Sequence, residues 1–293
     1  MTGFDPLIAS AVSGLAVPIF QSVWGGGGKL LRIFGKGLDE NTKKLIFNAS
    51  HQYEKNYRER HGLLKVLGMK KPMQLESIYT NVQFLDQENI WRFESIENLE
   101  KVYRVNKKRS FQTQDCQKKA GEEVANQEQF LMVLGGPGMG KSTFLRKMGL
   151  EALKIKGSKI NHKAIPVFIE LKNFKSGEIN IQDIIADEFD ICGFPDAEKF
   201  TAKALEQGKL LILFDGLDEV PNNATNEVIT KIEDFVDKYD KNRCIASCRV
   251  AAYHSSFRRF KDVAMAEFDD DQIQQFINNW FQSELDQQLG TAG

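Results

Sequence analysis

Residues 135–143 read GGPGMGKST, a stretch in which four of the nine residues are glycine. It fits the pattern G-x-x-x-x-G-K-[ST], which places Lys141 and Ser142 at its end. The apolar run FLMVL at 130–134 precedes it, and a helical pattern follows it. A strand, a glycine turn and a helix in this order form the context in which the pattern binds phosphate.

Each residue type in this loop has a chemical reason. Glycines let successive N–H groups converge on phosphate oxygens, and the amino terminus of the helix adds partial positive charge. Lys141 is expected to reach the outer phosphates, and Ser142 to ligate Mg²⁺. A plain glycine turn would explain neither residue. The predicted nucleotide-binding residues are Gly135, Gly136, Pro137, Gly138, Met139, Gly140, Lys141, Ser142 and Thr143.

A second motif, LLILFDGLDEV at 210–220, points to the same chemistry. Its apolar strand ends in Asp215, where a carboxylate would hold Mg²⁺ through water. Asp218 and Glu219 follow, and we expect them to act near the attacking water. Alone, the segment could equally be a strand that runs into an acidic turn, but beside a phosphate loop the catalytic interpretation is favoured.

A further apolar strand is predicted in CIASCR at 244–249. It ends in Arg249, which could sense the γ-phosphate; the alternative is a surface arginine at the end of a strand. Cys244 and Cys248 lie on this strand without a second cysteine pair or nearby histidines. We therefore expect core thiols and no zinc site.

Short apolar runs alternate with helical patterns from about residue 128 onward. Strands without polar alternation, separated by helices, indicate a parallel sheet covered on both faces. The sequence thus predicts an α/β fold of the P-loop NTPase type, preceded by a mainly helical amino-terminal region. The expected strands lie at 130–134, 165–171, 210–214 and 244–247. The expected domains are 1–40, 41–125 and 126–293.

The first 40 residues combine an amphipathic helical pattern with a run of four glycines at 25–28 and a short basic stretch. This segment could pack on the rest of the protein, or it could serve self-assembly or membrane contact. An early acidic residue and Pro18 argue against a signal peptide and a spanning helix.

The region 41–125 is expected to hold a helix from Asn41 to about Leu67, a strand at 77–85 and a helix at 96–105. His51 and His61 fall in the first helix without a carboxylate or cysteine at ligand spacing. Both are therefore predicted to be surface residues.

Composition excludes some partners. Thirty-nine basic and forty acidic residues leave a net charge of -1, so no overall field attracts nucleic acid or an anionic membrane. Sequence-specific nucleic-acid binding is not expected. Four scattered cysteines favour reduced thiols in a cytoplasm.

Taken together, these motifs resemble the NACHT group of signal-transducing P-loop NTPases of the STAND class. The resemblance rests on GGPGMGKST, on the LFDGLDEV form of the second motif and on SCR at the end of the following strand, and it covers about 128–290. The stretch FDDDQIQQFINNWF at 268–281 is similar to the helix that begins the lid region in this group. Residues 45–105 resemble, more weakly, the stretch that precedes the NTPase in prokaryotic members.

The resemblance implies a switch that is monomeric with ADP and that exchanges to ATP and oligomerises after an activating ligand binds. In prokaryotes such proteins are associated with defence against phage. ATP is favoured over GTP because no N-K-x-D element follows Asp215. The expected reaction is slow hydrolysis of the β–γ bond with Mg²⁺.

Two other functions stay open at this point. A small-molecule kinase would use the same phosphate loop but needs an acceptor site with its own base, and none is visible outside Asp218 and Glu219. A nucleotide-regulated protein that acts on membranes would use residues 1–40. Arg258 and Arg259 could meet a neighbouring subunit or its nucleotide, or they could be solvated charges.

Overall fold

The computed structural model describes residues 40–65, 72–85 and 118–289, apart from 155–156, 178, 195 and 254–256. The segment expected at 1–40, apart from Glu40, and the helix expected at 96–105 lie outside these residues. The helices are α3 (Glu40–His61), α4 (Leu75–Ile78), α7 (Gly121–Gln127), α8 (Lys141–Ala152), α9 (Ile181–Ile191), α10 (Ala197–Glu206), α11 (Thr225–Lys238) and α12 (Asp270–Leu289). The strands are β1 (Leu63–Leu64), β2 (Met73–Gln74), β3 (Gln83–Leu85), β4 (Lys118–Ala120), β5 (Phe130–Gly135), β6 (Ile165–Glu170), β7 (Leu210–Asp215), β8 (Arg243–Arg249) and β9 (Lys261–Met265).

The main sheet has seven strands in the order β4-β3-β9-β5-β8-β7-β6. The five strands from β9 to β6 are parallel, as predicted for strands that are apolar on both faces. The other two, β3 and β4, pair antiparallel at one edge. They come from the region predicted to precede the NTPase, yet they extend its sheet.

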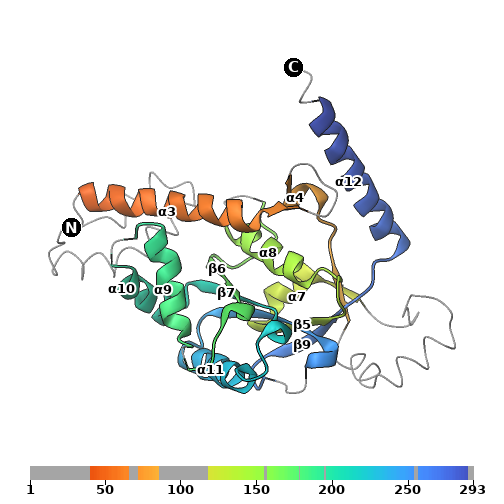
Figure 1. Ribbon diagram of the computed structural model, residues 1–293. Helices are drawn as coiled ribbons and strands as arrows, with labels where there is room; N and C mark the ends of the chain where they lie inside the picture. Colours follow the sequence, from red (N-terminus) through yellow and green to blue (C-terminus); the bar gives the residue numbers. More distant parts are fainter. Residues whose placement is uncertain are drawn as a thin grey trace.

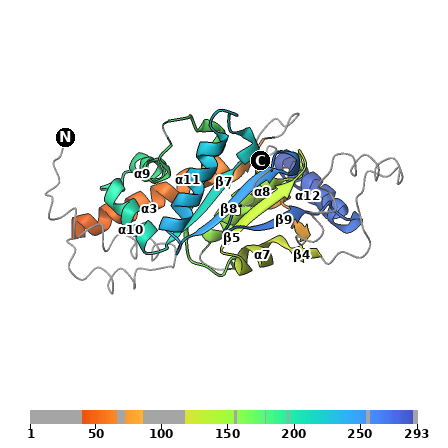
Figure 2. The ribbon, with the colours of Figure 1, turned by 90° about the horizontal axis from the view of Figure 1, so that it is seen from below.

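Helices cover both faces of the sheet, which confirms the predicted α/β class. In Figure 1, α8 and α3 lie on one side of the strands and α11 on the other, and Figure 2 shows α11 in front of the sheet. On α8 the buried positions include Phe144, Leu145 and Met148, at helical spacing. The outer helix α3 reaches the sheet through Tyr53, whose hydroxyl donates to the Pro166 carbonyl at 2.7 Å.

The segment expected as one strand at 77–85 is instead a helical turn, α4, followed by the short strand β3. Leu75 and Ile78 are both buried, because a spacing of three places them on the same face of a helical turn. The chain becomes a strand only from Gln83, whose carbonyl accepts a hydrogen bond from Ala266 N at 2.8 Å. The single-strand prediction was therefore wrong for residues 77–82.

His61 is buried, which contradicts the predicted surface position, whereas His51 is exposed as expected. The helix α3 ends at His61, and Gly62 leads into the β1–β2 hairpin, so the helix is shorter than predicted. The His61 ring lies 4.7 Å from Tyr57 and 4.5 Å from Phe168 between ring centroids. Its spacing of four from Tyr57 puts both rings on the buried face of α3.

Candidate functional site

Three predicted site segments meet at the carboxyl ends of adjacent parallel strands. The glycine loop follows β5, Arg249 ends β8 and Asp215 ends β7, with β8 between the other two. Carboxyl ends of parallel strands are where α/β sheets form their binding sites. The loop turns through Gly138 and Gly140, whose φ angles of 75° and 92° lie in the left-handed region that glycine adopts without strain.

Lys141 folds back over the glycine loop. Its ammonium donates to the carbonyls of Gly135 at 3.0 Å and Gly136 at 2.9 Å. Burial lowers the pKa of Lys141, and the nearby Asp218 carboxylate opposes this effect. The loop thus holds a partly buried ammonium group beside the carboxylate of Asp218. Ser142 and Thr143 follow it at the first turn of α8, partly exposed.

Asp215 is fixed by a residue that sequence reasoning did not single out. The buried Ser247 on β8 donates its hydroxyl to Asp215 Oδ1 at 2.7 Å and accepts a hydrogen bond from Gly216 N at 2.9 Å. Within the described part of the chain, no hydrogen bond reaches Asp215 Oδ2. The sequence offered one indication of this contact: Ser247 is the serine of the SCR sequence, and it lies on β8, the strand next to the one that ends in Asp215.

The oxygen donors at this site suit Mg²⁺. Ser142 offers a hydroxyl and Asp215 a carboxylate oxygen, and Mg²⁺ usually takes one or two such protein ligands together with water and phosphate. No group of three or more His, Cys, Asp and Glu residues that could enclose a metal occurs among the described residues. The donor set therefore fits a metal that is shared with a phosphate ligand.

The two acidic residues after Asp215 differ in their surroundings. Both oxygens of Asp218 are held by Arg249, through the backbone N–H to Oδ1 at 2.9 Å and through Nε to Oδ2 at 2.9 Å. The Asp218 side chain is only 7% exposed. Glu219 is exposed, and its side chain makes no hydrogen bond or ion pair to another described residue. Glu219 is thus the carboxylate with free oxygens.

The family model described as the NACHT domain matches residues 129–284, more than half of the 293 residues. The chain belongs to the NACHT family. NACHT domains are nucleotide-binding switches of the P-loop NTPase class, so this level of the predicted function is confirmed.

The other comparisons add little to the NACHT assignment. No curated protein matches the chain. The solved structure of PCH-2 from C. elegans is 14% identical, with a TM-score of 0.30, over 48% of this chain and 39% of that chain. The chain thus covers about two fifths of PCH-2. In the described residues, no helix is long and apolar enough to span a membrane.

Next to the glycine loop of the NACHT domain lies an apolar cavity of about 570 Å³. Its floor is formed by the loop and the first turn of α8, one wall by the α4 segment and another by α12. Sequence reasoning did not predict this cavity, because its walls lie far apart in the chain. The lining residues include Leu75, Ile78, Tyr79, Met139, Thr143, Phe276 and Trp280.

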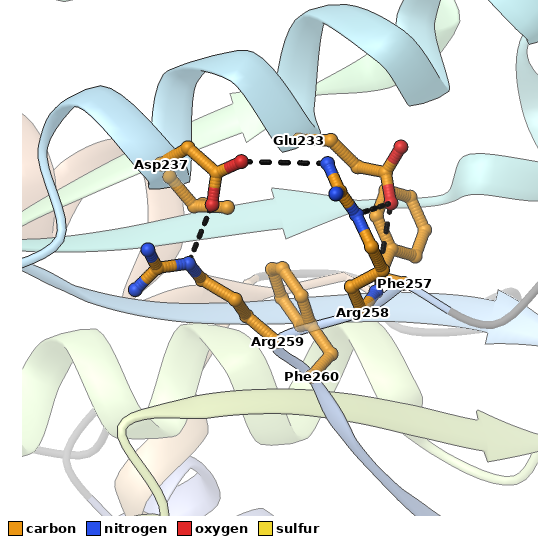
Figure 3. A pocket seen from close by; sticks show the side chains of 7 residues that line it. Glu233, Asp237, Phe257, Arg258, Arg259 and Phe260 are labelled. Atoms are coloured by element: carbon orange, nitrogen blue, oxygen red, sulfur yellow. Dashed lines mark hydrogen bonds and ion pairs between the residues drawn. The ribbon is translucent and has the colours of Figure 1, made fainter.

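Arg258 and Arg259 lie away from the NACHT nucleotide loop. They precede β9, whereas the loop follows the parallel neighbour β5, so the two features lie at opposite ends of these adjacent strands. Figure 3 shows both guanidinium groups turned toward α11, where Asp237 contacts both and Glu233 contacts Arg258. The stretch before them contains a short 3-10 turn at 250–252.

Proposed function

We propose that this NACHT domain binds ATP with Mg²⁺ and hydrolyses the β–γ bond slowly. The observation that carries the proposal is the convergence of Lys141, Ser142 and Asp215 at the carboxyl ends of two strands separated only by β8. Lysine, hydroxyl and carboxylate are the groups that P-loop enzymes place around the outer phosphates and their metal. A simple glycine turn would need none of them.

The glycine loop would bind the phosphates through its backbone. The N–H groups of the loop residues and the amino terminus of α8 provide partial positive charge, and Lys141 adds a full one. Its present bonds to the Gly135 and Gly136 carbonyls hold it within the same loop. Ser142 and Asp215 would hold Mg²⁺, which would neutralise charge on the phosphate oxygens.

Of the two remaining acids, we assign Glu219 to the attacking water. Its carboxylate is exposed and free to accept a proton or to orient water. Asp218 instead holds Arg249, and this pair would set the position of the guanidinium near the γ-phosphate. Arg249 is half exposed, so it can turn toward a bound phosphate.

The apolar cavity gives the nucleotide base a place. It begins at Gly138 and Thr143, beside the expected phosphates, and contains the Tyr79 and Trp280 side chains. A volume of about 570 Å³ falls within the range of small-ligand sites. Aromatic rings stack on nucleotide bases, whereas a phosphate-only ligand would have no use for such walls.

The switch cycle extends this proposal. In it, ATP binding follows an unknown activating ligand and leads to oligomerisation of the protein with itself, with a role in innate immune or anti-phage defence. Support comes from the family membership, which makes the chain a nucleotide-binding switch. Membrane contact would fall on residues 1–40, which lie outside the described range apart from Glu40.

Phosphate release with Mg-ATP as the only substrate tests the catalytic proposal. The wild type should release phosphate and ADP in equal amounts, as hydrolysis requires and a kinase awaiting its acceptor would not. Glu219→Gln should slow release by at least about tenfold and leave ATP affinity unchanged, because only the step that activates water is affected.

The matched control is Glu59→Gln, which changes an exposed carboxylate on α3. It should hydrolyse ATP like the wild type. Hydrolysis at the wild-type rate in Glu219→Gln would remove Glu219 from the mechanism. Absence of phosphate release by the wild type, despite tight ATP binding, would contradict the hydrolytic part of the proposal.

A further inference from the structure

A cluster of four charges connects α8 to α4. On α8, Lys147 contacts Glu151 Oε1 at 2.7 Å, and Lys154, two residues past the end of α8, contacts the same oxygen at 2.7 Å. From α4, Glu76 Oε1 lies 2.6 Å from Lys154 Nζ and 3.4 Å from Lys147 Nζ. The helix α8 begins with the phosphate-binding residues. Further along the chain, alternating charges connect it to α4.

The two inner members of this cluster are almost fully buried. The Glu151 side chain is 1% exposed and the Lys147 side chain 8% exposed. Burial alone would raise the pKa of Glu151, but hydrogen bonds from Lys147 and Lys154 lower this pKa to about 2. Buried charges are stable only when they are paired, so the cluster holds its members in fixed places.

The neighbours of Glu76 in the chain line the apolar cavity. Leu75, Ile78 and Tyr79 line it, while the Glu76 carboxylate contacts Lys147 and Lys154. The Lys147 ammonium also lies over the Tyr79 ring, 5.4 Å from its centroid. A cation at that distance attracts the ring face. The charge cluster therefore contacts the α4 wall of the cavity through Glu76 and Tyr79 and fixes its position.

The same glutamate on α8 reaches the other end of the wall. Glu151 Oε2 accepts a hydrogen bond from Lys159 N at 2.9 Å, and Lys159 Nζ donates to Asn81 Oδ1 at 3.0 Å. Asn81 in turn accepts, at its backbone carbonyl, a hydrogen bond from Gln272 of α12 at 2.6 Å. The wall segment 75–82 is thereby connected both to α8 and to the opposite wall of the cavity.

We propose that Glu76 and Glu151 are positioning residues for the nucleotide base: they fix the wall segment 75–82 relative to the phosphate-binding end of α8. This inference rests on the proposed placement of the base in the apolar cavity. It predicts that the cluster controls how much the base adds to affinity and leaves phosphate binding alone. Inorganic tripolyphosphate carries the phosphates without the base, so it separates the two contributions.

The test compares the affinities of Mg-ATP and Mg-tripolyphosphate by calorimetric titration of the full chain. In the wild type, ATP should bind more tightly than tripolyphosphate. In Glu76→Gln, ATP affinity should fall by about tenfold while tripolyphosphate affinity stays within about twofold, because contacts within one network couple by roughly this amount. Glu59→Gln, which breaks only an exposed pair on α3, should retain both wild-type affinities.

Lys154→Met provides an independent second variant, because its side chain is partly exposed and it removes the shortest contact of Glu76. Lys154→Met should also lose ATP affinity while it keeps tripolyphosphate affinity. If thermal melting shows that Glu76→Gln is unfolded, Lys154→Met alone tests the inference. Wild-type ATP preference that persists in both variants would overturn the inference. So would an equal loss of ATP and tripolyphosphate affinity. A wild type that binds both ligands equally would instead refute the base placement itself.

Discussion

At the scale of single residues, neighbours in the sequence have different chemical surroundings. Asp218 and Glu219 are adjacent, yet Arg249 occupies both oxygens of the first and the second is exposed. The sequence predicts two acids near the metal, and the fold places both just after Asp215 at the end of β7, but the sequence cannot divide their tasks. That division depends on β8 lying beside β7, as does the bond from Ser247 to Asp215.

The pairing of Asp218 with Arg249 has a measurable consequence. If Asp218 acts by holding Arg249, Asp218→Asn and Arg249→Ala remove the same contribution to hydrolysis. The double variant should then be no slower than the slower single variant, within about twofold, because residues that act as a unit are not additive. Steady-state phosphate release measures this. Effects that multiply in the double variant would show that the two side chains act separately.

At the scale of elements, the apolar patterns of the sequence predicted the strands and helices whose formation depends on nearby residues. The buried strands β5, β7 and β8 and the helix α8 lie where their apolar runs indicate, with ends shifted by a few residues. The α4 turn, the burial of His61 and the apolar cavity depend on segments distant in the chain. His61, for example, is surrounded partly by Phe168 of β6, which no pattern within α3 could reveal.

His61 makes the packing of α3 sensitive to pH. Burial, together with the charges of Arg60 and Arg146, lowers its pKa to about 3. His61 therefore takes up a proton near pH 6.5 in the unfolded chain but stays neutral in the folded chain. The free energy of unfolding consequently falls as the pH drops below 6.5. From pH 7.5 to 5.5 the loss of unfolding free energy should be about 1.4 kcal/mol, and His61→Phe should abolish it.

Urea unfolding at the two pH values measures this difference. His51→Gln changes an exposed histidine of the same helix and should keep the pH dependence of the wild type. A His61→Phe protein that loses stability as steeply as the wild type would assign the effect to other groups.

At the scale of the whole molecule, the question is assembly. Arg258 and Arg259 lie at the amino end of β9, and the nucleotide loop lies at the carboxyl end of its parallel neighbour β5, so within one chain they are remote from the phosphates. Their contacts with Glu233 and Asp237 are exposed, and exposed ion pairs are weak enough to exchange for a neighbouring subunit. This geometry leaves both solvated charges and an intersubunit role open.

Light scattering after size-exclusion chromatography distinguishes the two. With a non-hydrolysable ATP analogue the wild type should assemble, and with ADP it should stay monomeric. Arg258→Ala/Arg259→Ala should remain monomeric with the analogue while keeping nucleotide affinity. Lys203→Ala, an exposed change on α10, should assemble normally. Assembly of the double variant like the wild type would leave both arginines as solvated charges.

The central claim is that the glycine loop of this NACHT domain binds the phosphates of ATP, and calorimetric titration with Mg-ATP tests it most directly. The wild type should bind one nucleotide per chain. Lys141→Ala should lose at least about tenfold in affinity, since a charge-assisted contact to phosphate disappears, whereas Lys203→Ala should not change it. Equal affinities of the wild type and Lys141→Ala would contradict the claim.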